Sequence, residues 1–222
     1  MDDLGGVYEE HLREWLPQLL AAATNTLQMT LLAFLVALVA GLVLALAKLS
    51  PIVPIRAAAT AYIEVMRGIP ALVVLFLIYF GLADFGILFD AFTAAVIGLG
   101  LNGAAYLAEV IRAGILAVHR GQREAALTVG MTPLQAMRYV VLPQAFRVVL
   151  PPVANFGIAL LKDTSVASII SAPELMLRAR DLASSSFQPM AVFLLAAAIY
   201  LVMSLPISFL VRRLEAQLAR GR

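Results

Sequence analysis

The chain contains no cysteine and only two histidines, His11 and His119, among its 222 residues. The missing thiols exclude disulfides, thiol catalysis and cysteine-ligated metal sites. Two isolated histidines do not make a metal cluster, so we expect no metal site. The sequence also lacks a glycine-rich loop that ends in lysine and serine or threonine, which excludes ATP binding in the P-loop manner. We therefore expect neither a catalytic residue nor a bound cofactor in this chain.

Charged side chains are also scarce. They make up 14% of the residues, whereas 62% are hydrophobic and the mean hydropathy is +0.94. A globular protein of this length needs more polar side chain than this to cover its surface, so the composition indicates an integral membrane protein. The net charge of +2 is small, and the basic residues lie at the ends of apolar segments. The expected partner is therefore the lipid bilayer, and nothing points to nucleic acid.

Five apolar stretches are long enough to cross a bilayer, which takes about 20 residues. They run from Thr26 to Leu46, Ala57 to Leu82, Phe92 to Val118, Phe146 to Ile170 and Met190 to Val211. The residues before them mix acidic and apolar positions around Trp15, and we expect an amphipathic helix on the membrane surface there. This acidic start differs from the basic start of a secretory signal, so the first span should be retained. The predicted fold is an all-α polytopic membrane protein with one transmembrane domain over residues 1–222.

Lysine and arginine gather on one side of these spans, and cytoplasmic loops are enriched in both residues. One side collects Lys48, Arg56, Arg120, Arg123, Arg138, Arg147, Arg212, Arg213, Arg220 and Arg222, and the other holds Arg13, Arg178 and Arg180. Ten against three places the N-terminus outside and the C-terminus in the cytoplasm. The polar loop over residues 119–145 is then cytoplasmic.

This loop is the long, charge-bearing interruption between apolar spans, and we expect two short helices in it. Residues 124–129 favour a helix, and Gly130 stands where a left-handed residue would end it. The second helix has Thr132 as N-cap, Pro133 in the first position and Gln135 to complete a capping box. Read alone, such a loop is either an ordinary connection on lipid headgroups or a surface for a soluble partner.

Apolar residues of the second helix and its continuation recur at helical spacing. They are Met131, Leu134, Met137 and Val141, and together they form a stripe that fits a partner's groove. Leu142 and Pro143 follow this stripe. Because proline lacks an N–H, we expect Pro143 to interrupt or kink the chain before the fourth span.

The loop carries Glu124-Ala125-Ala126, three further residues, Gly130, nine further residues and then Val-Val-Leu-Pro at 140–143. This pattern resembles the EAA loop of ABC importer permeases. Only Val140 departs from it, where isoleucine is usual, and the exchange removes one methylene from an apolar position.

Other segments resemble the polar amino acid branch of that family, the permeases of the histidine, glutamine and arginine type. They are Asn25-Thr-Leu-Gln-Met-Thr30, Glu64-Val-Met-Arg-Gly-Ile-Pro70, Ala105-Tyr-Leu-Ala-Glu-Val-Ile-Arg-Ala-Gly114, Leu150-Pro-Pro152, Asn155 and Leu160-Leu-Lys-Asp-Thr-Ser165. The resemblance covers residues 24–213. It departs at Asn102-Gly103-Ala104, where hydroxyl-bearing residues are usual.

The resemblance implies a subunit of an ATP-driven importer in the cell inner membrane. Two permease subunits, identical or paralogous, would pack side by side on two ATP-binding subunits that hold the ATP and Mg²⁺, and an extracytoplasmic binding protein would deliver polar amino acids. Each loop would dock into an ATPase and transmit its closure as a rigid-body transition. The implied coupling residues are Glu124, Ala125, Ala126, Gly130, Met131, Leu142 and Pro143. Glu124 would contact the ATPase or cap the loop, the two alanines would allow close approach, and Gly130 would set the bend.

Charges inside the apolar spans are the second informative feature, since a charge at mid-membrane costs about 2.5–3.5 kcal/mol. Glu64 with Arg67, and Glu109 with Arg112, are three residues apart and share a helix face. Each pair either neutralises itself and joins helices or serves transport. Gly68 and Pro70 weaken the helix beside Arg67, as happens where a span lines a cavity.

Adjacent residues on a helix point in different directions, so we expect Lys162 or Asp163 to bond across to another span. A zwitterionic substrate needs a cation for its carboxylate and an anion or carbonyl groups for its ammonium. The predicted substrate pathway is Glu64, Arg67, Asn155, Lys162, Asp163, Thr164 and Ser165.

Three other interpretations are open at this point. An ion-coupled carrier would work without an ATPase, a permease for another small osmolyte would differ only in substrate, and a membrane scaffold would need no mid-span charges. The outer segment over residues 172–188 is expected to form a short helix and loop that meets the binding protein or caps the bundle.

Overall fold

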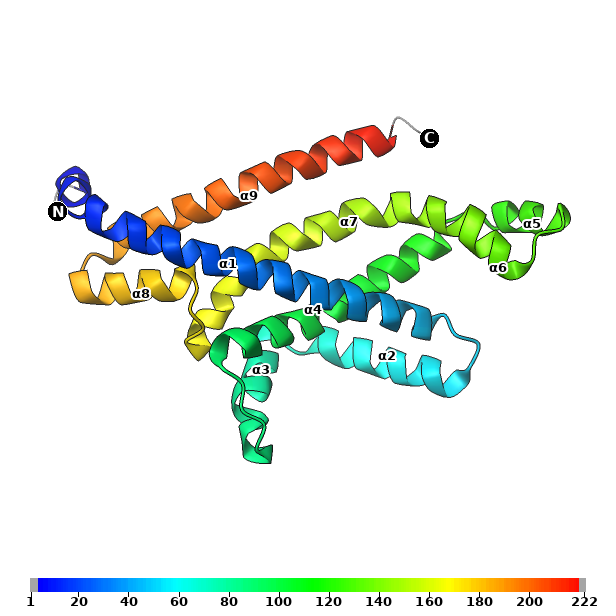
Figure 1. Ribbon diagram of the computed structural model, residues 1–222, viewed down its shortest axis with the longest axis horizontal. Coiled ribbons are helices and arrows are strands. Elements are labelled where there is room, and N and C mark those ends of the chain that lie inside the picture. Colours follow the sequence, from blue (N-terminus) through cyan, green and yellow to red (C-terminus); the bar gives the residue numbers. More distant parts are fainter. Residues whose placement is uncertain (1–3, 220–222) are drawn as a thin grey trace.

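The computed structural model describes the backbone of residues 4–219 and the side chains of residues 11–217 (Figure 1). Arg220 and Arg222 of the basic tail lie outside the described residues. Within them the chain forms helices and turns and contains no strand. The elements are α1 (Leu4–Lys48), α2 (Val53–Gly68), α3 (Ala71–Phe76), the π-helical turn η1 (Leu77–Gly81), the 3₁₀ turn η2 (Ala83–Phe85), α4 (Ala91–Leu116), α5 (Arg120–Thr128), α6 (Pro133–Ala136), the π-helical turn η3 (Met137–Val141), α7 (Leu142–Asp163), the 3₁₀ turn η4 (Thr164–Ile170), α8 (Leu175–Ser186) and α9 (Pro189–Ala219).

Four helical segments in the described chain are long and apolar enough to cross a membrane. They are His11–Lys48, Ala91–Leu116, Pro133–Ile170 and Pro189–Gln217. A fifth crossing exists only if α2 and the segment from α3 to η2, which are bent by 107° relative to each other, count as one broken span. The all-α polytopic fold is therefore confirmed.

The expected second span from Ala57 to Leu82 is not one helix, because it breaks between Gly68 and Ala71. Pro70 has no N–H to continue the hydrogen-bond ladder of α2, and the residue before it, Ile69, is extended with φ −102° and ψ 133°. Pro70 instead becomes the N-cap of α3. Gly68 and Pro70 weaken the helix as expected, and the chain turns sharply there instead of bending slightly.

The long helices run along the molecule, and the two termini lie at opposite ends of it (Figure 1). The loop with α5 and α6 lies at the end where α9 finishes, whereas α8 lies at the end where α1 begins. The short helix α3 and the turn after it project sideways from this bundle. The molecule thus has a loop end and a cap end, and the break between α2 and α3 lies between them.

The amphipathic helix expected on the membrane surface is instead the first part of α1. Residues 4–48 form one helix, and its initial part is a packed element instead of a separate one. Trp15 and Leu19 are buried and share a core cluster with Leu175 of α8 and Val192 of α9. These apolar partners explain why the segment docks on protein instead of resting on headgroups.

Helix α4 lies in the middle of the bundle, and glycines let its neighbours approach closely. A Cβ on Gly100 would lie 2.6 Å from Cγ1 of Val36 in α1, and a Cβ on Gly103 would lie 2.6 Å from Cζ of Phe156 in α7. Both distances are far below van der Waals contact. Small residues on α4 therefore permit close helix approach at these positions.

The fourth span differs from the expected one at its start. Pro143 does not interrupt it, because it occupies the first turn of α7, where a helix needs no backbone donor. The π-helical turn η3 joins α6 directly to α7. The second helix of the loop is consequently continuous with the span that follows it.

Candidate functional site

The loop over residues 119–145 holds two helices joined by a sharp turn, as the sequence predicts. Gly130 has φ +87°, its N–H donates to the Leu127 carbonyl at 3.0 Å, and the Met131 N–H donates to the Ala126 carbonyl at 3.1 Å. These two bonds are those of a Schellman turn, which satisfies the last carbonyls of α5. A Cβ on Gly130 would meet no atom within 4 Å, so glycine is required here by its backbone conformation and not by lack of space.

The second helix of the loop starts with the predicted capping box. The Thr132 hydroxyl accepts from the Gln135 N–H at 3.3 Å, and the Gln135 side-chain oxygen accepts from the Thr132 N–H at 2.8 Å. Gln144 of α7 donates to the Gln122 side-chain oxygen in α5 at 3.3 Å. The loop is therefore a defined structure that is anchored to the membrane-spanning helix.

Exposed apolar side chains interrupt the otherwise polar and charged surface of this loop. Val129 is 76% exposed and Leu134 is 77% exposed. Ala126 packs inward with Val141, whereas Ala125 faces out. The predicted stripe is thus split, since Val141 belongs to the interior and Leu134 to the surface. Of the other predicted coupling residues, Leu142 and Pro143 are exposed and Met131 is partly buried.

Glu124 also lies on this exposed surface. Among the described residues no hydrogen bond or ion pair holds its carboxylate, so the side chain does not cap the loop. The exposed carboxylate and the exposed Val129 and Leu134 side chains are the loop groups that a docking partner would contact.

A cavity of about 570 Å³ opens at the break between α2 and α3. Its lining comes from α2, α3, α4, α7 and η4 and comprises Arg67, Gly68, Ile69, Pro70, Ala71, Leu99, Asn102, Gly103, Tyr106, Phe156, Ala159, Leu160, Asp163 and Val166. The only charged residues in this lining are Arg67 and Asp163. The cavity therefore offers one cation and one anion within a wall that is otherwise apolar and aromatic except for the Asn102 amide.

Two of the predicted pathway residues, Arg67 and Asp163, line this cavity. The guanidinium carbon of Arg67 lies 5.9 Å from the ring centroid of Tyr106 in α4. This distance allows a cation–π contact, which holds the side chain without neutralising its charge. Arg67 makes no ion pair among the described residues, so the alternative in which Glu64 and Arg67 neutralise each other does not hold.

The other predicted pathway residues lie elsewhere. Asn155 donates to a Glu215 side-chain oxygen in α9 at 2.9 Å. Thr164 is fully buried and donates to the Leu161 carbonyl at 2.7 Å, and Ser165 donates to the Lys162 carbonyl at 2.7 Å. Neither Lys162 nor Asp163 bonds across to another span within the described residues, so that expectation is wrong.

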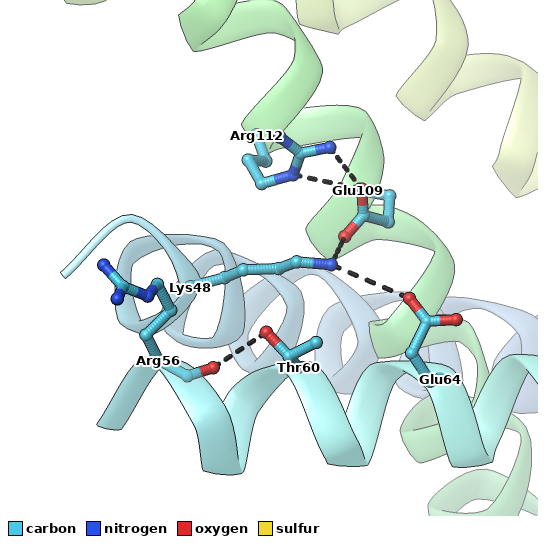
Figure 2. A network of polar contacts seen from close by, with 6 residues as sticks. All are labelled: Lys48, Arg56, Thr60, Glu64, Glu109 and Arg112. Atoms are coloured by element: carbon cyan, nitrogen blue, oxygen red, sulfur yellow. Dashed lines mark hydrogen bonds and ion pairs between the residues drawn. The ribbon is translucent and has the colours of Figure 1, made fainter. Parts of the chain in front are cut away.

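Glu64 belongs to a network of charged side chains that joins α1, α2 and α4 (Figure 2). The Lys48 ammonium lies 2.6 Å from Oε1 of Glu109 and 3.8 Å from Oε1 of Glu64. Arg112 donates to Oε2 of Glu109 from Nη2 at 2.8 Å and from Nε at 3.0 Å, as the spacing predicts. These charges neutralise one another and join three helices, so Glu64 belongs to the framework and not to the cavity lining.

At the opposite end of the molecule Glu174 is 1% exposed and caps α8. Its carboxylate accepts from the N–H groups of Met176 at 2.8 Å and Leu177 at 2.6 Å, and from the Tyr200 hydroxyl of α9 at 2.9 Å. Burial raises the pKa of Glu174 above its usual value, against the lowering effect of these hydrogen bonds. The Thr26 hydroxyl of α1 accepts from the Leu175 N–H at 3.0 Å, so three helices meet here.

Sequence reasoning missed three parts of these sites. The cross-helix bond from Lys48 to Glu109 was missed because it joins residues 61 apart. Asn102 and Tyr106 were missed as cavity residues, although a buried amide in the middle of an apolar helix is itself a signal.

In the part of the chain that the structure describes, no group of three histidine or acidic side chains is placed to hold a metal ion.

Comparison with known proteins identifies the family. Residues 37–220 match the family described as the binding-protein-dependent transport system inner membrane component. The probable amino-acid ABC transporter permease protein YckA of Bacillus subtilis is 41% identical over 187 residues, which are 84% of this chain and 83% of that protein. The glutamine transport system permease protein GlnP of Escherichia coli K12 is 36% identical over 205 residues, which are 91% of this chain and 94% of that protein.

Solved structures agree with this assignment. The crystal structure of an amino acid ABC transporter with histidines contains a chain that is 41% identical, with a TM-score of 0.90 over 98% of this chain and 99% of that one. The inward-facing MetNI methionine ABC transporter matches with a TM-score of 0.77 at 20% identity, covering 90% of this chain and 96% of that one, which shows a shared fold. Proteins of this family span the inner membrane, while ATP hydrolysis belongs to a separate subunit. The chain belongs to the binding-protein-dependent transport system inner membrane components, and it is the permease subunit of an ABC importer.

Proposed function

We propose that this permease carries polar amino acids, and that the cavity at the break between α2 and α3 is where the substrate rests during passage. The observation that carries the proposal is that Arg67 and Asp163 line the same cavity. A zwitterion needs one charge of each sign, and Arg67 is the planar donor that suits a carboxylate. The substrate carboxylate would contact Arg67 and the substrate ammonium would contact Asp163.

The size and position of the cavity support this proposal. Pockets for small ligands have volumes of about 300–1,000 Å³, and the volume of this cavity, about 570 Å³, lies within that range. A broken helix places backbone carbonyl groups at membrane depth, where they add acceptors for an ammonium group. The relatives are named as permeases for amino acids, glutamine among them, which favours amino acids over other osmolytes.

We further propose that the loop over residues 119–145 docks onto an ATP-binding subunit on the cytoplasmic side. Glu124, Leu134 and Val129 would face that subunit, and the Gly130 turn would set the angle between α5 and α6. A complete importer would hold two permease subunits and two ATPases, with the ATP and Mg²⁺ on the ATPases. The N-terminus and α8 would then lie outside, on the side that receives the substrate-binding protein.

Uptake by the reconstituted complex tests the proposed substrate class. The permease, its ATPase and its binding protein are placed in proteoliposomes, and ATP-dependent uptake is measured for a panel of labelled amino acids and for glycine betaine as the osmolyte probe. Arg67→Gln and Asp163→Asn should each reduce amino acid uptake at least about tenfold, since each removes one charged contact. Glu64→Gln is the matched control, because it neutralises an acidic residue of α2 outside the cavity lining.

Three results would overturn the proposal. Uptake that needs an ion gradient and no ATPase would show a secondary carrier. Betaine uptake that exceeds uptake of every amino acid would show an osmolyte permease. Unchanged uptake in both cavity variants would show that the substrate passes elsewhere.

A further inference from the structure

Near the end of α2 the backbone carbonyl of Met66 receives no hydrogen bond from within the helix. In a continuous helix the carbonyl of Met66 would accept from the N–H of the residue four positions later, which is Pro70. Proline has no N–H, so this bond does not form. The N–H of Ile69 donates to the Val65 carbonyl at 3.1 Å and gives Met66 nothing. A carbonyl left without a donor at membrane depth is costly, and another group has to satisfy it.

Asn102 of α4 provides the missing donor. Its side-chain nitrogen donates to the Met66 carbonyl at 2.8 Å, and the residue is only 8% exposed. One helical turn earlier on α2, the Tyr62 hydroxyl donates to the Leu101 carbonyl of α4 at 3.0 Å. Two adjacent residues of α4 thus bond to α2 one turn apart, and only the Asn102 bond lies at the break and in the cavity lining.

The position of this bond decides where the neighbouring cation points. Arg67 follows Met66 directly, so the bond from Asn102 fixes the last peptide before the cavity cation. Tyr106, one turn after Asn102 on α4, holds the guanidinium itself at 5.9 Å. The same face of α4 therefore restrains both the backbone and the side chain of Arg67.

We propose that Asn102 is a positioning residue that sets carboxylate specificity by holding the broken end of α2, so that Arg67 faces the cavity. This inference rests on the proposed function, because it assumes that Arg67 receives the substrate carboxylate. Asn102 acts through Arg67 and satisfies no substrate group itself. Its donor suits the site because the amide reaches across the helix interface, whereas a serine or alanine side chain is too short to do so.

Direct binding to the permease–ATPase complex without the binding protein tests this inference, since the binding protein has a specificity of its own. The probes are labelled L-histidine and L-glutamine, each compared with its α-carboxamide, which keeps the ammonium and loses the carboxylate charge. The wild type should prefer the acid to the amide by about tenfold, as expected for a charged hydrogen bond. Asn102→Leu keeps the volume and removes the donor, and it should reduce this preference to less than about threefold by weakening acid binding.

Three further variants separate positioning from general damage. Tyr62→Phe removes the other bond between α2 and α4 and should keep the wild-type preference. Asn102→Gln restores an amide and should recover part of it. In an Arg67→Gln background the preference should already be lost, and Asn102→Leu should weaken acid binding no further, because the two residues act as one unit. If Asn102→Leu does not assemble with the ATPase, Asn102→Ser is used in both backgrounds.

Each outcome has a separate meaning. A wild-type preference retained in an assembled Asn102 variant would overturn the positioning role and leave the proposed function standing. An equal further loss of acid binding in the Arg67→Gln background would also overturn it, because Asn102 would then act independently. A wild-type complex that docks its ATPase and binds none of the amino acid panel would overturn the proposed function itself.

Discussion

The two ends of the molecule differ in how the glutamate of each short connecting helix finds its hydrogen-bond partners. At the cap end a short helix, α8, is held by Glu174, whose carboxylate is 1% exposed and fully engaged by internal donors. At the loop end another short helix, α5, carries Glu124, whose carboxylate is exposed and has no partner among the described residues. Both helices connect spans and have similar lengths. They differ in whether the glutamate carboxylate of the helix is satisfied by donors within the described chain.

This difference indicates which end forms its stabilising contacts within the chain. The cap end buries Trp15 and Leu19 in a core of its own, so its stability comes from the chain alone. The loop end has a well-formed backbone, with a Schellman turn and a capping box, yet it exposes Val129 and Leu134 to about three quarters. An ordered surface with exposed apolar side chains is what the proposed docking of an ATP-binding subunit requires. Substitutions at the cap end should therefore change stability, and those at the loop end should change coupling.

The largest effect is expected from Gly130→Val. A valine at φ +87° is strained by roughly 1–2 kcal/mol, so the turn between α5 and α6 should change its angle. ATP-dependent uptake should fall at least about tenfold while membrane insertion is kept, because the loop no longer fits the ATPase. Glu124→Lys should act in the same direction by reversing the charge of the docking surface.

Gly86 provides the control, because it has φ +79° and, like Gly130, has no atom within 4 Å of an added Cβ. Gly86→Val imposes the same kind of strain in a turn away from the loop, and uptake should stay within about threefold of the wild type. Equal losses of uptake in the two glycine variants would mean that strain alone, and not the coupling surface, explains the result. Normal uptake and normal stimulated ATPase activity in both Gly130→Val and Glu124→Lys would remove the basis for the coupling loop.

Glu174→Ala should produce the largest loss of stability at the cap end. It removes the N-cap of α8 and leaves the Tyr200 hydroxyl without its acceptor, which should cost about 2–3 kcal/mol. For a chain of this size that corresponds to roughly 5–10 °C in Tm, measured on the purified complex in detergent. Glu174→Gln keeps one acceptor oxygen and should lose much less. Equal Tm values for the alanine variant and the wild type would show that the cap end is not held by this carboxylate.

A smaller effect is expected from pH at the same residue. Because burial raises the pKa of Glu174, the folded protein binds a proton more tightly than the unfolded chain. The stability from this group is complete below the unfolded pKa of 4.5 and is lost as the pH rises through the folded pKa. As the pH rises above about 5, the Tm of the wild type should therefore fall relative to that of Glu174→Gln. A constant difference over this range would contradict a raised pKa.

The sequence predicts features of this fold that depend on local chemistry. The helical turn at Gly130, the capping box at Thr132 and the ion pair from Glu109 to Arg112 all join residues within six positions, so spacing alone decides them. The resemblance to importer permeases supplies what spacing does not, namely the family and the role expected of the loop.

Features that depend on the packing of distant segments were not predictable in this way. Trp15 has a pattern typical of a surface helix, and it is buried because α8 and α9 cover it. Glu64 shares a helix face with Arg67 by spacing, yet Lys48 and Tyr106 compete for the two side chains. The break at Pro70 is visible in the sequence, but its 107° angle and the bond that Asn102 makes to Met66 from another helix are not.

The smallest effect should come from Thr132→Ala, which tests whether the order of the loop is built in or supplied by its partner. Losing the capping box costs about 1 kcal/mol locally, too little to change the Tm of the whole protein. Amide hydrogen exchange at residues 134–136 should nevertheless become about fivefold faster in the free permease, because that free energy governs local opening. Thr132→Ser keeps the hydroxyl and should exchange like the wild type. If alanine and serine variants exchange alike, the cap does not order the loop, and its structure depends on the ATPase instead.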